Sequence, residues 1–300
     1  MAGETAERDA GALPAGVPGD SVYVETDGVR LHTVQAGPDD GPLVVLLHGF
    51  PEFWYAWHEA IRPLTNAGYR VVVPDQRGYN LSDKPPEVRD YAIDELAGDV
   101  VGLASELGYD AAHVVGHDWG AAVAWWTALA YPDAVDHLVA AAVPHPSVFR
   151  RTLQQSWEQR FRSWYMGFFQ LPKLPESTLS AGNYRLLARS MRKSSVPGTF
   201  TPADLDRYRE AWSQPGALTA MINWYRAAAR ERPTPPNERV GQPTLVLWGA
   251  GEPFLNKSMA WRSVDYCDDG RVHLYDDCTH WLHHEQPVAV AERIVDFLGE

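Results

Sequence analysis

The segment Gly116–Gly120 (Gly-His-Asp-Trp-Gly) places one carboxylate between two glycines at the end of an apolar run. The run itself, His113–Val115, predicts a buried strand, and the small residues from Ala121 onwards favour a helix directly after the motif. Glycines allow a tight strand-to-helix turn that projects the middle side chain, Asp118. A carboxylate is ionised at neutral pH and can attack an electrophilic carbon without a base, forming an ester of Asp118 itself. A helix N-cap with no catalytic role is the alternative interpretation of the five residues.

Short apolar runs alternate with helical patterns on both sides of this motif. Leu43–Leu47, Val71–Val73 and Leu138–Val143 are typical of strands buried on both faces of a parallel sheet. The alternation predicts a doubly wound α/β sheet. The other expected elements are a hairpin of Ser21–Glu25 and Arg30–Gln35 around Asp27 and Gly28, later strands at Thr244–Trp248 and Val272–Tyr275, and helices at about Tyr55–Asn66, Ile93–Leu107, Ala121–Tyr131 and Val288–Leu298.

Four motifs occur in an order that resembles the epoxide hydrolase branch of the α/β-hydrolase superfamily. They are His48–Pro51 (His-Gly-Phe-Pro), Asp75–Tyr79 (Asp-Gln-Arg-Gly-Tyr), Ser82 and Gly116–Gly120, and the likeness extends from about Ser21 to Leu298. The resemblance implies the α/β-hydrolase fold: a mostly parallel, eight-stranded sheet flanked by helices, with a helical lid inserted after the sixth strand. It also implies conversion of an epoxide and water to a vicinal diol through an alkyl ester on Asp118.

The resemblance assigns the remaining catalytic groups. The backbone N–H groups of Phe50 and Trp119 form the oxyanion hole, with a cis bond before Pro51. His280, after the last strand, is the base that activates water, in preference to the neighbouring His283 and His284.

Glu252 stands where most relatives carry Asp and is expected to orient the His280 imidazole. Asp276 and Asp277 are the alternatives for this acid.

Two tyrosines of the lid indicate the type of leaving group. Tyr165 and Tyr225 lie in segments that resemble those carrying the family's paired tyrosines, and a phenol with a pKa of about 10 suits the oxygen of an opening epoxide. Packing in an aromatic-rich lid is the alternative role for each. The substrate pocket is predicted to include His48, Pro51, Trp164, Trp224 and Trp281.

A haloalkane or haloacid dehalogenase with the same nucleophile is the second hypothesis. Trp119, Trp164 and Trp224 could donate indole N–H groups to a halide. However, Phe50 stands where haloalkane dehalogenases usually have Asn, and the residues after Asp118 include no arginine to hold a haloacid carboxylate. An esterase lacks support because no serine occupies the turn, and a binding protein that has lost catalysis should lack one of the groups named above.

Composition limits the partners. The 300 residues have a net charge of −13, which argues against nucleic acid and anionic membranes, and no run approaches the length of a membrane span. We expect no metal or organic cofactor, a small apolar epoxide as substrate, and a cytoplasmic location without a signal peptide; a homodimer is compatible with the sequence. Cys267 and Cys278 are expected to be small buried apolar side chains.

The expected domain organisation has four parts. Residues 1–20 form a disordered tail, 21–144 and 236–300 form the hydrolase core, and 145–235 form the helical, aromatic-rich lid.

Overall fold

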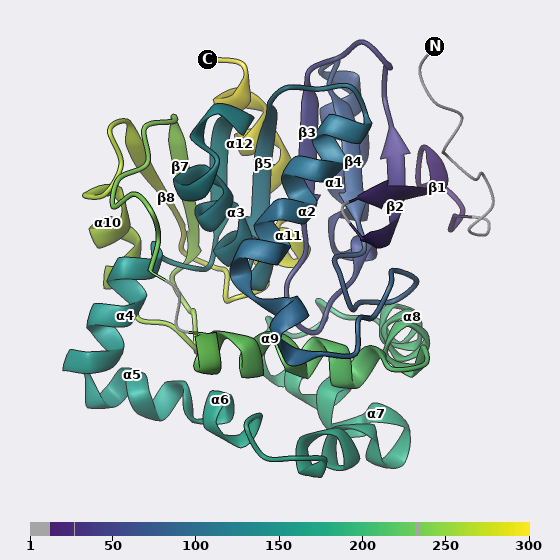
Figure 1. Cartoon of the computed structure of the whole chain (residues 1–300), viewed down its shortest axis with the longest axis vertical. Coiled ribbons are helices and arrows are strands. Elements are labelled where there is room, and N and C mark those ends of the chain that lie inside the picture. The colour runs from purple at the N-terminus through teal and green to yellow at the C-terminus, as the bar shows by residue number, and fades with distance from the viewer. Residues whose placement is uncertain (1–12, 27, 232–233) are drawn as a thin grey trace.

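A computed structural model describes residues 13–26, 28–231 and 234–300, and its centre is an eight-stranded sheet (Figure 1). The strands are β1 (Asp20–Thr26), β2 (Val29–Ala36), β3 (Leu43–Leu47), β4 (Arg70–Pro74), β5 (Ala112–His117), β6 (Val135–Ala141), β7 (Thr244–Gly249) and β8 (Gly270–Tyr275). Their order across the sheet is β1-β2-β4-β3-β5-β6-β7-β8. The pairs β1–β2 and β2–β4 are antiparallel, and every other pair is parallel. The predicted mostly parallel sheet is confirmed.

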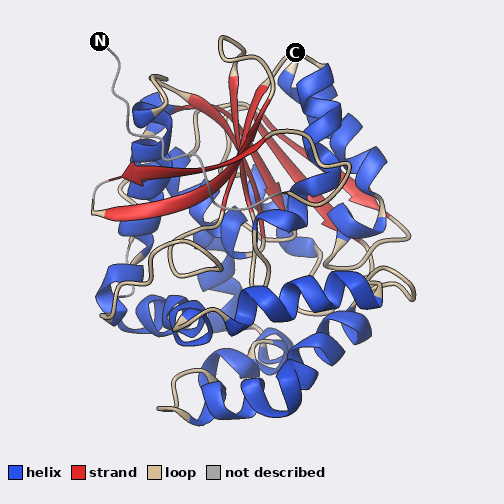
Figure 2. Cartoon of the chain, turned by 90° about the vertical axis from the view of Figure 1, so that its right-hand side faces the viewer, coloured by secondary structure: helices blue, strands red, loops and turns tan. Residues whose placement is uncertain are grey.

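The central strands are apolar because helices cover both faces of the sheet. Every residue of β3, β5 and β7 is buried. Helices α1 and α12 pack together on one face, and α2 and α3 pack together on the other, as the two views of the sheet show (Figures 1 and 2). The helices of this core are α1 (His58–Asn66), α2 (Ile93–Glu106), α3 (Trp119–Ala130), α10 (Ser258–Val264), α11 (Leu282–Glu285) and α12 (Pro287–Leu298), with short 3₁₀ turns η1 (Trp54–Trp57), η2 (Val88–Tyr91) and η3 (Pro132–Ala134).

Between the sixth and seventh strands the described residues form six helical elements, which we call the helical insertion. They are α4 (Pro146–Gln155), α5 (Trp157–Arg162), α6 (Trp164–Phe168), α7 (Leu174–Ser194), α8 (Pro202–Ser213) and α9 (Ala217–Glu231). The backbone of Ala181–Tyr184 is not helical, so α7 consists of two helical stretches joined at a kink. In both views the insertion lies across the end of the sheet opposite the C-terminus of the chain (Figures 1 and 2). Whether it is a separate domain spanning 145–235 stays a prediction.

Hydrogen bonds join the insertion to loops of the core. The indole of Trp212 donates to the carbonyl of Pro51 at 2.6 Å, and the indole of Trp224 donates to the carbonyl of Arg77 at 3.0 Å. The side-chain amide of Gln159 donates to the carbonyl of Phe254 at 2.9 Å. Because the bonds to Pro51 and Arg77 are buried, each of these two satisfies a polar group that would otherwise destabilise the fold, whereas the bond to Phe254 is only partly buried.

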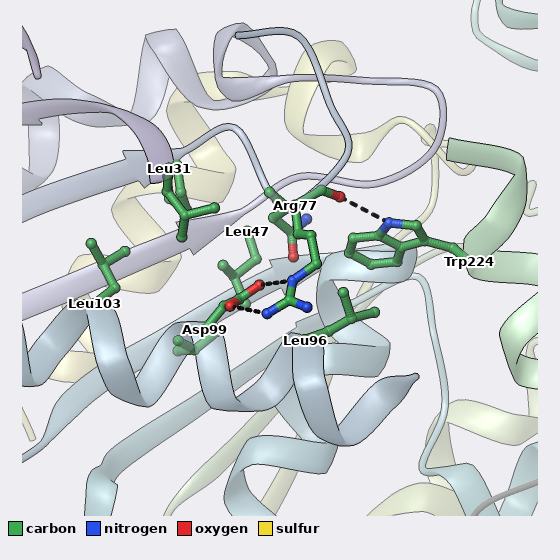
Figure 3. Close-up of a pocket in the computed structure, with 10 residues that line it drawn as sticks. Leu31, Leu47, Arg77, Leu96, Asp99, Leu103 and Trp224 are labelled. Atoms are coloured by element: carbon green, nitrogen blue, oxygen red, sulfur yellow. Dashed lines mark hydrogen bonds and ion pairs between the residues drawn. The ribbon is translucent and has the colours of Figure 1, made fainter. Parts of the chain in front are cut away.

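The motif Asp75–Tyr79 has a structural role. Arg77 forms a two-pronged ion pair with Asp99 of α2, with N···O distances of 2.8 and 2.6 Å, among buried leucines (Figure 3). The cavity beside this pair has a volume of about 10 Å³, which is at most the space of one water molecule. The Asp75–Tyr79 motif therefore stabilises the fold, and the candidate catalytic residues lie in other loops.

The remaining sequence predictions concern the N-terminal region and the cysteines. Residues 1–12 and Asp27 lie outside the described residues. The predicted disorder of residues 1–12 and the predicted turn at Asp27 therefore stay predictions. Leu13 and Val17 pack against the core, and β1 begins at Asp20. Cys267 and Cys278 are buried and unpaired, as expected.

Candidate active site

Asp118 lies in the strand-to-helix turn between β5 and α3. Its backbone has φ 49° and ψ −121°, a strained conformation for a residue with a side chain. The flanking glycines are required by space, because a Cβ on Gly116 would collide with the backbone of Gly120, and a Cβ on Gly120 would collide with the backbone of Leu47. The turn therefore fixes the direction of one carboxylate at the end of the central strand.

The loop after β3 supplies a donor to this carboxylate. The backbone N–H of Phe50 donates to Oδ1 of Asp118 at 2.8 Å, and the peptide between Phe50 and Pro51 is cis, as expected. Trp119 is the first residue of α3, and its partly buried ring packs 5.0 Å from the ring of Tyr225. Oδ2 of Asp118 is left on the side of the imidazole of His280.

His280 bridges two carboxylates. Its Nε2 lies 3.5 Å from Oδ2 of Asp118, and its Nδ1 lies 2.6 Å from Oε2 of Glu252. The fully buried carboxylate of Glu252 also accepts the N–H of Phe254 at 2.7 Å, so it is held in place. The structure thus pairs His280 with Glu252, while Asp276 and Asp277 are exposed.

The charges of this triad stabilise one another. Burial lowers the pKa of His280, but the carboxylates of Glu252 and Asp118 outweigh it and raise that pKa to about 10. Burial raises the pKa of Asp118, but hydrogen bonding to His280, nearby imidazoles and the Phe50 N–H lower it overall. The resting site therefore contains an ionised Asp118 beside a protonated His280.

Tyr165 from α6 and Tyr225 from α9 come together on the insertion side of the site. Their ring centroids are 6.0 Å apart, and the ring of Tyr225 lies 5.2 Å from that of Phe50. Burial and then the charge of Asp118 raise the pKa of both phenols. Both hydroxyls consequently keep their protons at neutral pH and can act as donors near the nucleophile.

The predicted pocket residues are placed differently from expectation. Trp164 is 65% exposed on the outside of the insertion, so its assignment to the pocket is wrong. His48 has no exposed surface, and its Nε2 accepts the backbone N–H of Gln76 at 3.1 Å, so it joins two loops and lines no pocket.

Three other predicted pocket residues are also engaged in packing. Trp224 and Trp281 are almost fully buried, and the Trp281 indole donates to Ser194 at 2.9 Å. Pro51 is buried beneath Trp212. These side chains support the loops around the site and have almost no surface left for a ligand.

Sequence reasoning missed a buried carboxylate behind the triad. Glu52 accepts hydrogen bonds from His117 at 2.8 Å, from His284 at 2.7 Å and from His283 at 3.2 Å. The other nitrogen of His117 lies 2.9 Å from the carbonyl oxygen of His280. Glu52 thereby connects the loop after β3, the turn that carries Asp118 and the loop that carries His280.

The sequence did contain a signal for this network, namely that each of its members is close in sequence to a predicted catalytic residue or motif. Glu52 directly follows the His-Gly-Phe-Pro motif, His117 precedes the nucleophile, and the two histidines shortly follow His280. Glu52, His117 and His283 bring potential ligand atoms within 4.8 Å of one another, the one such group found in the described part of the chain. The carboxylate is already surrounded by hydrogen-bond donors, which satisfy its charge, whereas Nδ1 of His283 is buried without a hydrogen-bond partner.

The arrangement is that of an α/β hydrolase. Asp118 lies on a sharp turn after the central strand β5, Glu252 follows β7, and His280 follows the last strand, β8. A family model described as the α/β hydrolase fold matches residues 42–287. The chain is 45% identical to YfhM, an α/β-hydrolase superfamily protein of Bacillus subtilis, over 92% of this chain and 96% of that protein.

Epoxide hydrolases are among the similar proteins. The chain is 39% identical to epoxide hydrolase 1 of Caenorhabditis elegans, over 94% of this chain and 70% of that protein. The crystal structure of Bacillus megaterium epoxide hydrolase with an inhibitor superposes with a TM-score of 0.84 at 30% identity, covering 93% of this chain and 100% of that one. The protein therefore belongs to the epoxide hydrolase family of α/β hydrolases.

Proposed function

We propose that the protein hydrolyses a small apolar epoxide to a vicinal diol through an ester on Asp118. The observation that carries the proposal is the pair of phenols, Tyr165 and Tyr225, whose rings lie 6.0 Å apart next to the loop and the strained turn that hold the Asp118 carboxylate. The carboxylate supplies the nucleophile, and the phenols supply donors for the oxygen that leaves the carbon. The insertion that carries both phenols acts as the lid of the site.

In the first step, Oδ2 of Asp118 attacks a ring carbon while the C–O bond of the epoxide breaks. The opening oxygen takes up a proton from Tyr165 or Tyr225, and the second phenol donates a hydrogen bond to it. Oδ1 is already bound to the N–H of Phe50, so it remains the carbonyl oxygen of the ester. The N–H of Trp119 is the proposed second donor to that oxygen.

In the second step, a water molecule attacks the ester carbonyl of Asp118 and His280 accepts its proton. Ester formation removes the charge of Asp118, one of the two carboxylates that raise the pKa of His280. The pKa of the imidazole therefore falls, and the proton that His280 carries at rest replaces the one that the phenol gave to the epoxide oxygen. The neutral imidazole can then accept a proton from water, and Glu252 stabilises the protonated form that results. Collapse of the tetrahedral intermediate releases the diol and restores the Asp118 carboxylate.

The geometry gives the dehalogenase alternative little support. Of the three tryptophans that could bind a halide, Trp164 points to solvent and Trp224 donates its N–H to the carbonyl of Arg77. Trp119 alone remains near Asp118, and a single indole is a weak halide site. A cytoplasmic location and a homodimer stay predictions.

The purified protein should form diols from simple aryl and alkyl epoxides and release no halide from halogenated alkanes or acids. Diol formation is measured by chromatography and halide release by a colorimetric assay on the same enzyme preparation. Halide release without diol formation would contradict the proposal and would mean that both tyrosines serve only in packing.

Replacing Tyr165 or Tyr225 by Phe should slow ester formation about 100-fold, because one preorganised donor to the developing oxyanion is lost. Stopped-flow tryptophan fluorescence in single-turnover experiments separates ester formation from hydrolysis, and the hydrolysis rate should be unchanged. Tyr184→Phe is the matched control, because this tyrosine also lies in the insertion but packs on Trp212. Equal effects on both steps would argue against a role in ring opening.

A further inference from the structure

Exposed apolar side chains are concentrated in one part of the insertion. Ten large hydrophobic residues are exposed among the described residues, and seven of them lie between positions 157 and 196. These seven are Trp157, Phe161, Trp164, Leu171, Leu174, Leu186 and Val196. Exposed apolar residues that are scattered singly over a protein need no explanation, whereas clustered ones indicate an interaction surface.

The aromatic members form a stripe along α5 and α6. Trp157 and Phe161 are each 80% exposed, and their spacing of four residues places them on one side of α5. Trp164, which is 65% exposed, begins α6 directly after Ser163, whose φ of −92° and ψ of 14° lie outside helical geometry and separate the two helices. The ring of Phe168 lies 6.2 Å from that of Trp164 and extends the stripe inward.

The same segment is basic, although the chain as a whole is strongly acidic. Positions 146–194 contain nine Lys or Arg and two Asp or Glu, a net charge of +7, so the rest of the chain carries −20 against a total of −13. The basic residues are Arg150, Arg151, Arg160, Arg162, Lys173, Arg185, Arg189, Arg192 and Lys193. All except the partly buried Arg162 are exposed.

Basic and apolar groups alternate on this surface. The guanidinium of Arg160 lies 4.6 Å from the ring centroid of Trp157, and Lys173 lies in sequence between two exposed leucines. Both acidic residues of the segment are already paired, Glu158 with Arg162 and Glu176 with Arg226. Helices α5, α6 and α7 form the outermost layer of the molecule, at the end remote from the sheet (Figures 1 and 2).

We propose that this outer face of α5–α7 is a peripheral binding surface for a lipid bilayer with anionic headgroups. Tryptophan and phenylalanine rings insert at the level of the headgroups, and exposed lysine and arginine side chains are attracted to anionic lipid. In the described ranges no helix is long and apolar enough to cross a bilayer, so the contact is a surface contact. The acidic remainder of the molecule is repelled from the same bilayer and orients this end towards it.

A second copy of the chain fits the surface less well. A symmetric contact would place the same basic residues of two molecules against each other, which opposes association. The bilayer instead offers the opposite charge and an apolar layer together. The proposal differs from the expectation that no anionic membrane is bound, because that expectation used the total charge and the proposal uses the charge of this end alone.

The test is co-sedimentation of the full chain with vesicles of phosphatidylcholine alone or of a three-to-one mixture of phosphatidylcholine and phosphatidylglycerol. Wild type should bind the anionic vesicles and be released by high salt. Two variants should each bind the anionic vesicles at least about tenfold more weakly than wild type. They are the aromatic variant Trp157→Ser/Phe161→Ser and the charge variant Arg185→Gln/Arg189→Gln/Lys193→Gln. Trp261→Ser, at a 46% exposed tryptophan of α10, is the matched control and should bind like wild type.

Melting temperature and diol formation from a water-soluble epoxide confirm that each variant is folded, because none of these side chains contacts the triad. Failure of wild type to bind anionic vesicles overturns the proposal, and so does equal binding to both vesicle types. A wild-type dimer that the aromatic substitutions dissociate, with no vesicle binding, also overturns it and identifies the stripe as a contact between copies. None of these outcomes depends on which substrate the enzyme uses.

Discussion

An Asp118→Ala variant is expected to form no diol above the uncatalysed rate. The methyl side chain of alanine cannot attack the epoxide. Glu252 and Glu52 cannot take over the role of Asp118, because both carboxylates are buried and hydrogen-bonded to histidines. Removal of the nucleophile from a covalent mechanism typically costs about 10⁶-fold in kcat. The measurement is kcat with a saturating epoxide, together with the intact mass of the protein after incubation with substrate, which should show no adduct.

The control for this variant is Asp206→Ala, which removes an exposed acid of α8 and should leave kcat unchanged. Activity of Asp118→Ala within tenfold of wild type would exclude the covalent route. A direct attack of water on the epoxide, with His280 as base, would then be the simplest remaining mechanism.

The second large effect is expected for His280→Gln, which should form the ester and then retain it. Ring opening needs Asp118 and the two tyrosines, whereas ester hydrolysis needs a base, so only the second step is lost. We expect kcat to fall by about 10³- to 10⁴-fold, at the upper end of what general base catalysis provides. Mass spectrometry of the intact protein should show an increase equal to the mass of the substrate.

His273→Gln, on the edge strand β8, is the matched control and should accumulate no adduct. If His280→Gln forms no adduct with any epoxide that wild type consumes, then His280 acts before ester formation and the proposed order of steps is wrong. Glu252→Gln should show the same adduct at a lower level, since the imidazole remains but loses its charged partner.

The fold and the triad could be predicted because their signals are local. The apolar runs that form β3 and β5 are continuous, since both faces of those strands are buried, and this pattern needs no knowledge of distant contacts. Asp118, Glu252 and His280 each follow a strand, and parallel strands bring such positions to one edge of the sheet. Chain position together with the family resemblance therefore indicated which groups meet, although position did not separate Glu252 from Asp276 and Asp277.

Side-chain direction within the insertion could not be predicted in the same way. Trp164 and Tyr165 are neighbours in a segment rich in aromatic residues, and successive residues of a helix point about 100° apart, so only one of them can face the nucleophile. The sequence does not show which side of α6 contacts the core. The Glu52 network was missed for a related reason: its donors lie 65 to 232 positions away in the chain.

The hydrogen bonds between the insertion and the core imply that the insertion cannot be exchanged freely between related enzymes. Trp212, Gln159 and Trp224 donate to carbonyls beside the oxyanion loop, beside the acid and within the Asp75–Tyr79 motif. An insertion transplanted from a relative without matching donors would leave the buried carbonyls of Pro51 and Arg77 unsatisfied, at about 1–3 kcal/mol each. Efforts to alter substrate preference should therefore change individual side chains near Asp118, because the insertion and the core loops that it contacts are exchangeable only together.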